Sequence, residues 1–288
     1  MSIWFSEDHT PNVRFSLEID KELLSRESEY QKIEVLRSRE FGRVLVLDGS
    51  ITLTEKDEFI YHEMIVHVPM AVHPEVRRVL IVGGGDGGVL HQLVSYPTIE
   101  AIDMVEIDPL LVQVCKKFFP KLAASFSDPR VTVIHEDGLR YVRRVAATYD
   151  LIIVDSSDPA ERGANLFSRE FFGNCFKALD EDGIVVNQHE SPFYSQDASM
   201  VQDIYRKTRA VFPIDRLYQV HLPSFPSGHW LFGFMSKTLD PLKDLDDERW
   251  NALGLKTRYY NTELHRGAFA LPNYVQKLLK IKESSRKA

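Results

Sequence analysis

Four short apolar segments of this sequence are each followed by acidic residues, and these are the residues whose types and spacing could do chemistry. Gly83-Gly84-Gly85-Asp86-Gly87-Gly88 follows residues 79–82, Glu106 follows 101–105, Glu136-Asp137-Gly138 follows 131–134, and Asp155-Ser156-Ser157-Asp158-Pro159 follows 151–154. Because the carboxyl ends of parallel strands meet at one edge of a sheet, these groups are expected to surround one crevice. Several carboxylates in one crevice favour a ligand with several positive charges.

The glycine-rich segment and Glu106 together indicate a nucleoside. Gly83 and Gly85 have no β-carbon, which lets a ligand approach the backbone closely. Alone, the segment is a weak signal, since a tight turn between a strand and a helix with no ligand also explains it. Glu106 stands about twenty residues further along, where an acid accepts hydrogen bonds from the ribose hydroxyls of a bound nucleotide. The pair therefore predicts a nucleoside-binding loop.

Asp86 separates two classes of nucleoside ligand. A carboxylate inside the loop repels the pyrophosphate of a dinucleotide, whereas it attracts the sulfonium of S-adenosylmethionine or of its decarboxylated form. An aminopropyl transfer and a methyl transfer both remain open at this point. A binding protein without catalysis is a third hypothesis.

Each remaining acid has a structural alternative. Asp137 either faces the exocyclic amine of adenine or caps a helix. Asp155 and Asp158, three residues apart in a loop, can converge on one cation, although Asp158 could instead organise the turn before Pro159. Surface or capping roles suit Asp103 and Asp108, the two acids that flank Glu106.

The elements that must position these residues follow from the apolar pattern. The first seventy or so residues alternate polar and apolar, with turn signals at Phe41-Gly42 and Asp48-Gly49, which predicts a small antiparallel sheet. A helix is expected over 54–72, ended by Pro69 and Pro74. The apolar segments from Val79 onward predict a Rossmann-like doubly wound sheet, with further strands near 183–187, 216–221 and 230–236. We place the domains at 1–73 and 74–288.

Composition excludes several classes of protein. A net charge of -7 over 288 residues argues against a nucleic-acid partner. No apolar segment has the length of a membrane span, so a cytoplasmic protein with no membrane partner is expected. Cys115 and Cys175 lack the spacing of a zinc site or a disulfide framework, and the histidines form no HExxH motif, so no metal is expected.

Taken together, the motifs resemble one family. GGGDGG at 83–88, VEID at 105–108, EDG at 136–138, DSSDP at 155–159, LDG at 47–49 and EKDEFIYHEM at 55–64 are similar to spermidine synthase and related aminopropyltransferases. LPSFPSG at 222–228 and YYNTELHRGAFALP at 259–272 resemble later segments of the same family. The resemblance covers nearly the whole chain in one order.

The resemblance implies a small N-terminal β domain and a class I methyltransferase-like Rossmann domain, in a homodimer or homotetramer. It also implies decarboxylated S-adenosylmethionine as co-substrate, a polyamine such as putrescine as acceptor, and no metal or prosthetic group. Asp155 would be the general base, assisted by Tyr61, in a reaction that yields spermidine and methylthioadenosine. Residues expected at the donor are Gln31, His62, Gly83, Gly85, Asp86, Glu106, Asp137 and Gly138. Residues expected at the amine are Tyr61, Asp86, Asp155, Asp158, Gln188 and Glu190.

The sequence departs from the family pattern at three places. Residues 160–164 read Ala-Glu-Arg-Gly-Ala, Phe225 stands where many members have a tyrosine, and His189 replaces a commoner small residue. These changes leave the donor and the reaction intact. They leave the acceptor open among putrescine, agmatine and a longer triamine.

Overall fold

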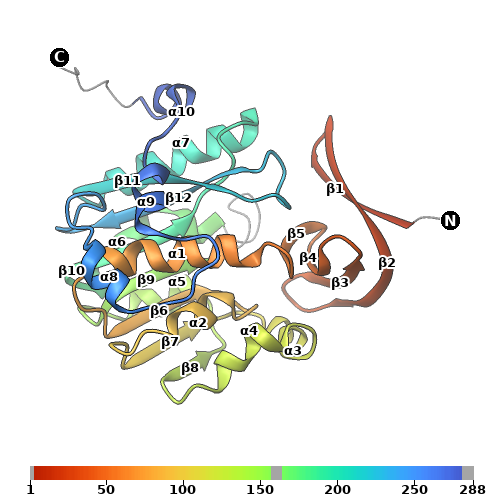
Figure 1. The fold of residues 1–288 in the computed structure, drawn as a ribbon, viewed down its shortest axis with the longest axis horizontal. Helices are drawn as coiled ribbons and strands as arrows, with labels where there is room; N and C mark the ends of the chain where they lie inside the picture. Colours follow the sequence, from red (N-terminus) through yellow and green to blue (C-terminus); the bar gives the residue numbers. More distant parts are fainter. Residues whose placement is uncertain (1–2, 157–163, 281–288) are drawn as a thin grey trace.

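The computed structural model describes residues 3–156 and 164–280, which fold into two β-sheets (Figure 1). Sheet A is antiparallel and keeps the order of the chain: β1 (Ile3–Thr10), β2 (Val13–Glu27), β3 (Lys32–Ser38), β4 (Gly42–Leu47) and β5 (Ser50–Thr54). Asp48 and Gly49 connect β4 to β5 with φ angles of 48° and 88°, as a two-residue hairpin turn requires. The predicted antiparallel sheet and this turn are confirmed.

Sheet B is the predicted Rossmann-like sheet, and one of its strands is reversed. Its strands are β6 (Arg78–Gly83), β7 (Ala101–Val105), β8 (Val131–Ile134), β9 (Tyr149–Asp155), β10 (Leu179–Gln188), β11 (Ile214–His221) and β12 (His229–Ser236). The spatial order is β11-β12-β10-β9-β6-β7-β8, and β12 runs antiparallel to both of its neighbours. Residues 222–228, which join β11 to β12, are too few for a parallel crossover of a dozen or more residues. The sheet is therefore mixed.

Helices cover both faces of sheet B (Figure 1). On β6, Val79 and Ile81 pack into one core and Leu80 and Val82 into another, because successive side chains of a strand point to opposite faces. The first face is covered by α1 (Glu58–Val72), α2 (Gly88–Leu93), α8 (Asp247–Ala252) and α9 (Thr262–Ala268). The second face is covered by α5 (Gly138–Arg143), α6 (Arg169–Ala178) and α7 (Ser195–Arg209). A short α10 (Asn273–Leu278) packs beside α7.

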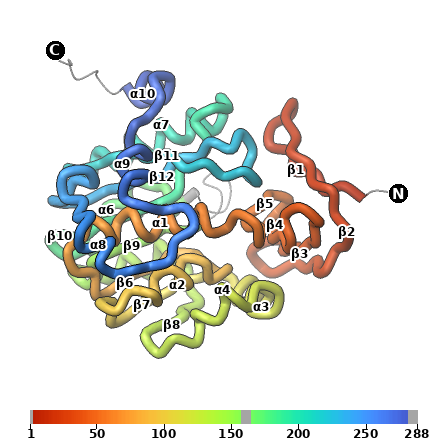
Figure 2. The backbone as a smooth tube through the Cα atoms, in the orientation of Figure 1, coloured from red at the N-terminus to blue at the C-terminus, as the bar shows by residue number. Residues whose placement is uncertain are grey.

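Sheet A packs against the helices that follow β7. There α3 (Pro109–Phe118) and α4 (Pro120–Ala123) lie beside the sheet (Figure 2). Leu45 and Leu53 of sheet A share a core with Leu111 and Cys115 of α3. At the outer end, His9 of β1 reaches back to α7, with its Nε2 2.8 Å from an oxygen of Asp197. These contacts fix sheet A against the mouth of the crevice.

Helix α1 connects the two sheets and belongs to the core of sheet B. Met64, Ile65, Val66 and Val68 are fully buried there. The helix predicted over 54–72 begins later than expected, at Glu58, and ends at Val72 as predicted, so it continues past Pro69. Pro69 has no N–H to donate to the carbonyl of Ile65, and the buried residues around it hold the helix together despite this lost hydrogen bond. The domain division at residue 73 stays a prediction.

Glu63 ties α1 to a distant part of the chain. Its buried carboxylate accepts hydrogen bonds from the backbone N–H groups of Arg258, Tyr259 and Tyr260 at 2.8–3.1 Å. The guanidinium of Arg258 lies 3.6 Å from the ring centroid of Phe59, one helical turn earlier. One side of α1 is thereby held in place while the other side faces the crevice.

None of the helices in residues 3–156 and 164–280 combines the length and the apolarity that a membrane-spanning helix needs.

We predict that Glu63→Ala lowers the free energy of unfolding by about 2 kcal/mol, since it leaves buried backbone donors without an acceptor. Chemical denaturation measures the change. Glu248→Gln removes one charge from an exposed position of α8 and should change stability by less than about 0.5 kcal/mol. Equal effects of the two substitutions would contradict the role given to Glu63.

Candidate active site

A cavity of about 550 Å³ lies at the carboxyl ends of β6, β7 and β9, and sheet A closes one side of it. The predicted site residues that the structure describes all line it: Gln31, Tyr61, His62, Gly83, Gly85, Asp86, Glu106, Asp137, Gly138, Asp155, Gln188 and Glu190. Asp158 and residues 160–163 lie outside the described residues. The four strand ends of sheet B therefore surround one cavity, as predicted, and sheet A contributes further residues to it, Gln31 among them.

Glycine is required where the ends of β6 and β9 meet. Gly83 has a φ of 88°, and a β-carbon there would overlap the backbone carbonyl of Asp155. The next residue, Gly84, donates its N–H to that same carbonyl oxygen at 2.8 Å. This close approach brings the side chains of Asp86 and Asp155 to the same end of the cavity.

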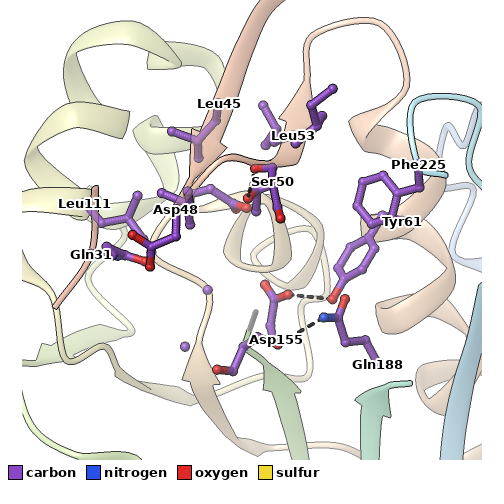
Figure 3. A pocket seen from close by; sticks show the side chains of 18 of the residues that line it. Gln31, Leu45, Asp48, Ser50, Leu53, Tyr61, Leu111, Asp155, Gln188 and Phe225 are labelled. Atoms are coloured by element: carbon purple, nitrogen blue, oxygen red, sulfur yellow. Dashed lines mark hydrogen bonds between the residues drawn. The ribbon is translucent and has the colours of Figure 1, made fainter. Parts of the chain in front are cut away.

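Asp155 has the properties of a proton acceptor. The hydroxyl of Tyr61 donates to its Oδ1 at 2.7 Å (Figure 3), while its Oδ2 is buried with no hydrogen-bond partner among the described residues. Burial and then the charge of Asp86 raise the pKa of Asp155 to about 6, against the opposing effects of His62 and Tyr61. Burial and the nearby Asp155 raise the pKa of Tyr61 well above 10, so its hydroxyl keeps its proton and donates.

Asp86 is paired with a histidine held by a second acid. Its Oδ1 accepts the N–H of Gly88 at 2.6 Å and lies 3.6 Å from Nε2 of His62, whose Nδ1 lies 2.8 Å from Glu58. Burial disfavours the charged forms, but the mutual attraction of His62 and Asp86 outweighs it. The pKa of His62 is raised well above 6.5 and that of Asp86 is lowered. A β-carbon on Gly88 would overlap the imidazole, so this position must be glycine.

Glu106 and Asp137 lie at the expected nucleoside end of the cavity. Glu106 is buried and accepts the backbone N–H of Asp108 at 2.8 Å. Burial raises the pKa of Glu106 to about 7, even though the N–H groups of Asp108 and Gly85 favour the ionised form. Asp137 accepts the N–H of Arg140 at 2.9 Å and caps α5, so its capping role is confirmed while the residue also lines the cavity.

Gln31 lines the cavity with its amide already engaged. Its Nε2 donates to Asp108 at 2.9 Å, and the hydroxyl of Ser28 donates to the same carboxylate oxygen at 2.7 Å. Asp108 also caps α3, as predicted, by accepting the N–H of Leu110. A surface position for Asp108 is wrong, because the residue is fully buried between the two sheets. Asp103 accepts the hydroxyl of Tyr149 and has no contact with the cavity.

The expected amine end combines one polar side with an apolar wall. Nε2 of Gln188 donates to the carbonyl of Ser156 at 3.1 Å, next to Asp155 (Figure 3). Opposite, the ring of Phe225 lies 6.5 Å from Tyr61 and 5.1 Å from Trp230 between centroids. Such a wall suits the methylene groups of an amine.

His189 does not face the cavity. Its ring is buried against Gly233, neither nitrogen has a partner among the described residues, and burial lowers its pKa to about 3. It is a neutral packing residue.

Sequence analysis did not assign to the site six acids that line the cavity: Glu7, Asp8, Asp48, Asp57, Glu58 and Asp197. Glu58 precedes His62 by one turn of α1, and this spacing of four residues was a usable signal. Asp57 accepts the N–H of Ser224 at 2.9 Å and ties the start of α1 to residues 222–228. Glu7 is buried on β1 and accepts the N–H of Ile51 at 2.9 Å. Neither of the latter contacts leaves a local pattern in the sequence.

His62, Asp86 and Asp155 form a cluster whose donor atoms all lie within 4.8 Å of one another. Both ring nitrogens of His62 face carboxylates, so both carry protons and neither offers a lone pair to a metal ion. The cluster is therefore better suited to organic cations. No donor set for a prosthetic group is evident in the described part of the cavity.

A mixed sheet with one reversed strand, and an acidic cavity at its carboxyl edge, are typical of a Rossmann-like domain of the class I methyltransferase-like type. Residues 58–247 match the family model of the spermine/spermidine synthase domain, and residues 3–55 match that of the spermidine synthase tetramerisation domain. The chain belongs to the spermine/spermidine synthase family, the polyamine aminopropyltransferases.

Relatives match the chain from end to end. The polyamine aminopropyltransferase of Alkaliphilus oremlandii is 56% identical over 98% of this chain and 100% of its own length. The polyamine aminopropyltransferase of Lachnoclostridium phytofermentans is 57% identical over 97% of this chain and 99% of its own length. Among solved structures, a spermidine synthase in complex with the transition-state analogue AdoDATO has a TM-score of 0.94 at 39% identity, covering 97% of this chain and 96% of its own. The structure of spermidine synthase from Thermotoga maritima has a TM-score of 0.93 at 39% identity, and the match covers 97% of this chain and 95% of that one.

Sequence analysis predicts that Glu106 accepts the ribose hydroxyls of the nucleoside. If this prediction holds, methylthioadenosine should bind more tightly as the pH rises through about 7, because an ionised carboxylate accepts hydroxyls better than the neutral acid does. If only the ionised form binds, affinity increases about tenfold between pH 6 and pH 8. Calorimetry at several pH values measures this. Glu106→Gln should weaken binding and flatten the dependence, whereas Glu136→Gln, outside the cavity, should keep it. A flat profile for the unchanged protein would rule out this contact.

Proposed function

We propose that the protein transfers the aminopropyl group of decarboxylated S-adenosylmethionine to putrescine, giving spermidine and methylthioadenosine, with Asp155 as general base. The observation that supports this best is that Asp155 lines the cavity and that its Oδ2 atom is buried with no partner among the described residues. A buried carboxylate oxygen without a donor is suited to receive a proton from the acceptor.

The acceptor must lose a proton before it can react. An alkyl ammonium has a pKa near 10, like that of lysine, and its charged form has no lone pair for attack. Asp155, with a pKa of about 6, is ionised at neutral pH and can take that proton. Tyr61 holds the other carboxylate oxygen at 2.7 Å and keeps the acid oriented. The role of Tyr61 in catalysis is thus to position the base.

The transfer step then balances without a further acid. The neutral amine nitrogen attacks the methylene carbon bonded to the sulfonium, and a C–N bond forms as the C–S bond breaks. The electron pair of the broken bond goes to sulfur, which leaves as the neutral thioether of methylthioadenosine. The positive charge moves from sulfur to the new secondary ammonium. Positioning and charge complementarity are what the protein must supply.

We assign the donor to the side of the cavity lined by the glycine-rich loop. Glu106 would accept the ribose hydroxyls, and Asp137 with Gly138 would face the adenine. Gln31 and His62 would contact the donor, and Asp86 would lie between its aminopropyl nitrogen and the incoming amine. A carboxylate that remains ionised in this loop attracts a sulfonium and repels phosphate.

We assign the acceptor to the side lined by Tyr61, Gln188, Glu190 and Phe225, with Asp158 as a further anchor for the distal ammonium. The apolar wall of Phe225 and Trp230 fits the four methylene groups of putrescine. Agmatine and a longer triamine remain alternative acceptors. The relatives are aminopropyltransferases, which argues against methyl transfer as the reaction. A homodimer or homotetramer is part of the proposal, since the first sheet matches a tetramerisation domain.

Incubation of the purified protein with decarboxylated S-adenosylmethionine and each of putrescine, agmatine and spermidine tests the proposal. We expect methylthioadenosine to form fastest with putrescine. Faster release with another amine would reassign the acceptor. Methyl transfer from intact S-adenosylmethionine, or amine binding without any turnover, would overturn the proposed function.

We predict that Asp155→Asn lowers kcat at least 10²-fold, the usual loss for a missing general base, because the amide cannot accept the proton. The dissociation constant of methylthioadenosine should stay within about threefold, since the donor side is unchanged. Asp180→Asn changes an exposed acid of β10 in the same way and should leave both values unaffected. Near-normal turnover by Asp155→Asn would remove Asp155 from this role.

A further inference from the structure

His62 is an unexpected residue in a cavity that is otherwise acidic. Among the described residues that line the cavity, His9 and His62 are the basic side chains, and no lysine or arginine joins them. His9 lies at the outer end, paired with Asp197. His62 lies instead beside Asp86 and Asp155, where the cations of both substrates must come. A positively charged side chain beside the expected binding sites of two cations would repel them, so the presence of His62 requires an explanation.

The position of His62 is fixed on three sides. Glu58 lies 2.8 Å from its Nδ1, one turn earlier on the same helix. The ring packs against the backbone of Gly88, where no β-carbon could be accommodated. The ring of Tyr61 meets it edge-on at 5.4 Å between centroids. With Nδ1 donating to Glu58, the remaining nitrogen, Nε2, faces Asp86 at 3.6 Å.

We propose that Glu58 is a positioning residue: it holds the imidazolium of His62 between Asp86 and Asp155, so that both aspartates remain ionised until the amine arrives. The inference rests on the proposed function, in which Asp155 must accept a proton. Without a cation beside them, two buried carboxylates disfavour each other's ionised form. His62 supplies that cation in the free enzyme, and Glu58 supplies the anion that keeps His62 charged.

All the groups that face His62 agree with this arrangement. Glu58 on α1, Asp86 after β6 and Asp155 at the end of β9 are acidic and favour the charged imidazole. Tyr61 is a neutral phenol. Within residues 3–156 and 164–280, the basic group that interacts with His62 is His91 of α2, and burial lowers its pKa, which keeps it neutral at pH 7. Removing Glu58 should therefore weaken proton binding by His62 and strengthen proton binding by Asp155.

The pH profile of kcat/KM separates this role from a merely structural one. The acid limb of the unchanged enzyme is expected near pH 6, where Asp155 ionises. In Glu58→Gln it should move upward by about 0.5 to 1 pH unit, as the loss of a neighbouring charge implies. Glu58→Asp keeps the negative charge and should move the acid limb by less than half of the shift seen in Glu58→Gln. Glu248→Gln, an exposed change of the same kind, should not move it.

A double substitution shows whether Glu58 acts through His62. His62→Gln should shift the acid limb in the same direction as Glu58→Gln. If Glu58 acts through His62, adding Glu58→Gln to His62→Gln produces no further shift, so the two effects are strongly non-additive. Independent, additive shifts would overturn the proposal. An unmoved acid limb in a folded Glu58→Gln protein, with its melting temperature preserved, contradicts either this inference or the role of Asp155, and the titration of His62 separates the two.

A direct titration of His62 distinguishes failure of this inference from failure of the proposed function. Nitrogen NMR of the full-length protein with labelled histidine follows the imidazole of His62, assigned by its absence in His62→Gln. Its titration should move at least one pH unit lower in Glu58→Gln. If the NMR titration moves and the acid limb does not, Asp155 is not the base. If the NMR titration does not move, the role of Glu58 is excluded.

Discussion

The close placement of two buried carboxylates, Asp86 and Asp155, is the interaction on which the rest of the site depends. Burial and their mutual repulsion both oppose ionisation, and this is why the pKa of Asp155 rises to about 6. Gly83 and Gly84 make the arrangement possible by letting the ends of β6 and β9 approach. His62 and Tyr61 make it stable by placing a charge and a hydrogen-bond donor beside the acids. A bound cationic ligand can take over the role of His62 by placing a positive charge beside the two aspartates. Binding of the substrates is thereby linked to the ionisation of Asp155.

Helix α1 is the element through which the fold controls this pair. One stretch of it presents Glu58, Tyr61 and His62 to the cavity, while Met64 and its neighbours fill the core of sheet B. Glu63, between these two groups, anchors the helix to residues 258–260. Asp57 anchors its first turn to residues 222–228, which also present Phe225. A shift of α1 would therefore move Tyr61 and His62 relative to Asp155, which lies at the end of β9, and would displace the apolar wall as well.

The sequence was sufficient to predict those features that depend on neighbouring residues. Apolar runs ended by Gly83, Glu106 and Asp155 predicted the strands and the edge at which their acids meet, because parallel strands share one polarity. The reversed direction of β12 was missed, although the short segment 222–228 contained the signal. Contacts such as Asp57 with Ser224, or Gln31 with Asp108, join residues far apart in the chain and leave no local pattern. They follow from how α1 and sheet A dock, which tertiary packing decides.

The distribution of charge explains why such a site can work with few polar contacts to the reacting atoms. In the proposed transfer, one positive charge moves from sulfur to nitrogen within the same cavity, so the carboxylates stabilise the substrates and products about equally. What changes is the proton of the acceptor, and it has to be removed before the carbon can be attacked. Selectivity for this chemistry therefore rests on the group that takes the proton, and on the neighbours that determine when it can do so. In the proposed reaction Asp155 would meet that requirement, because burial and Asp86 raise its affinity for a proton while His62 and Tyr61 lower it.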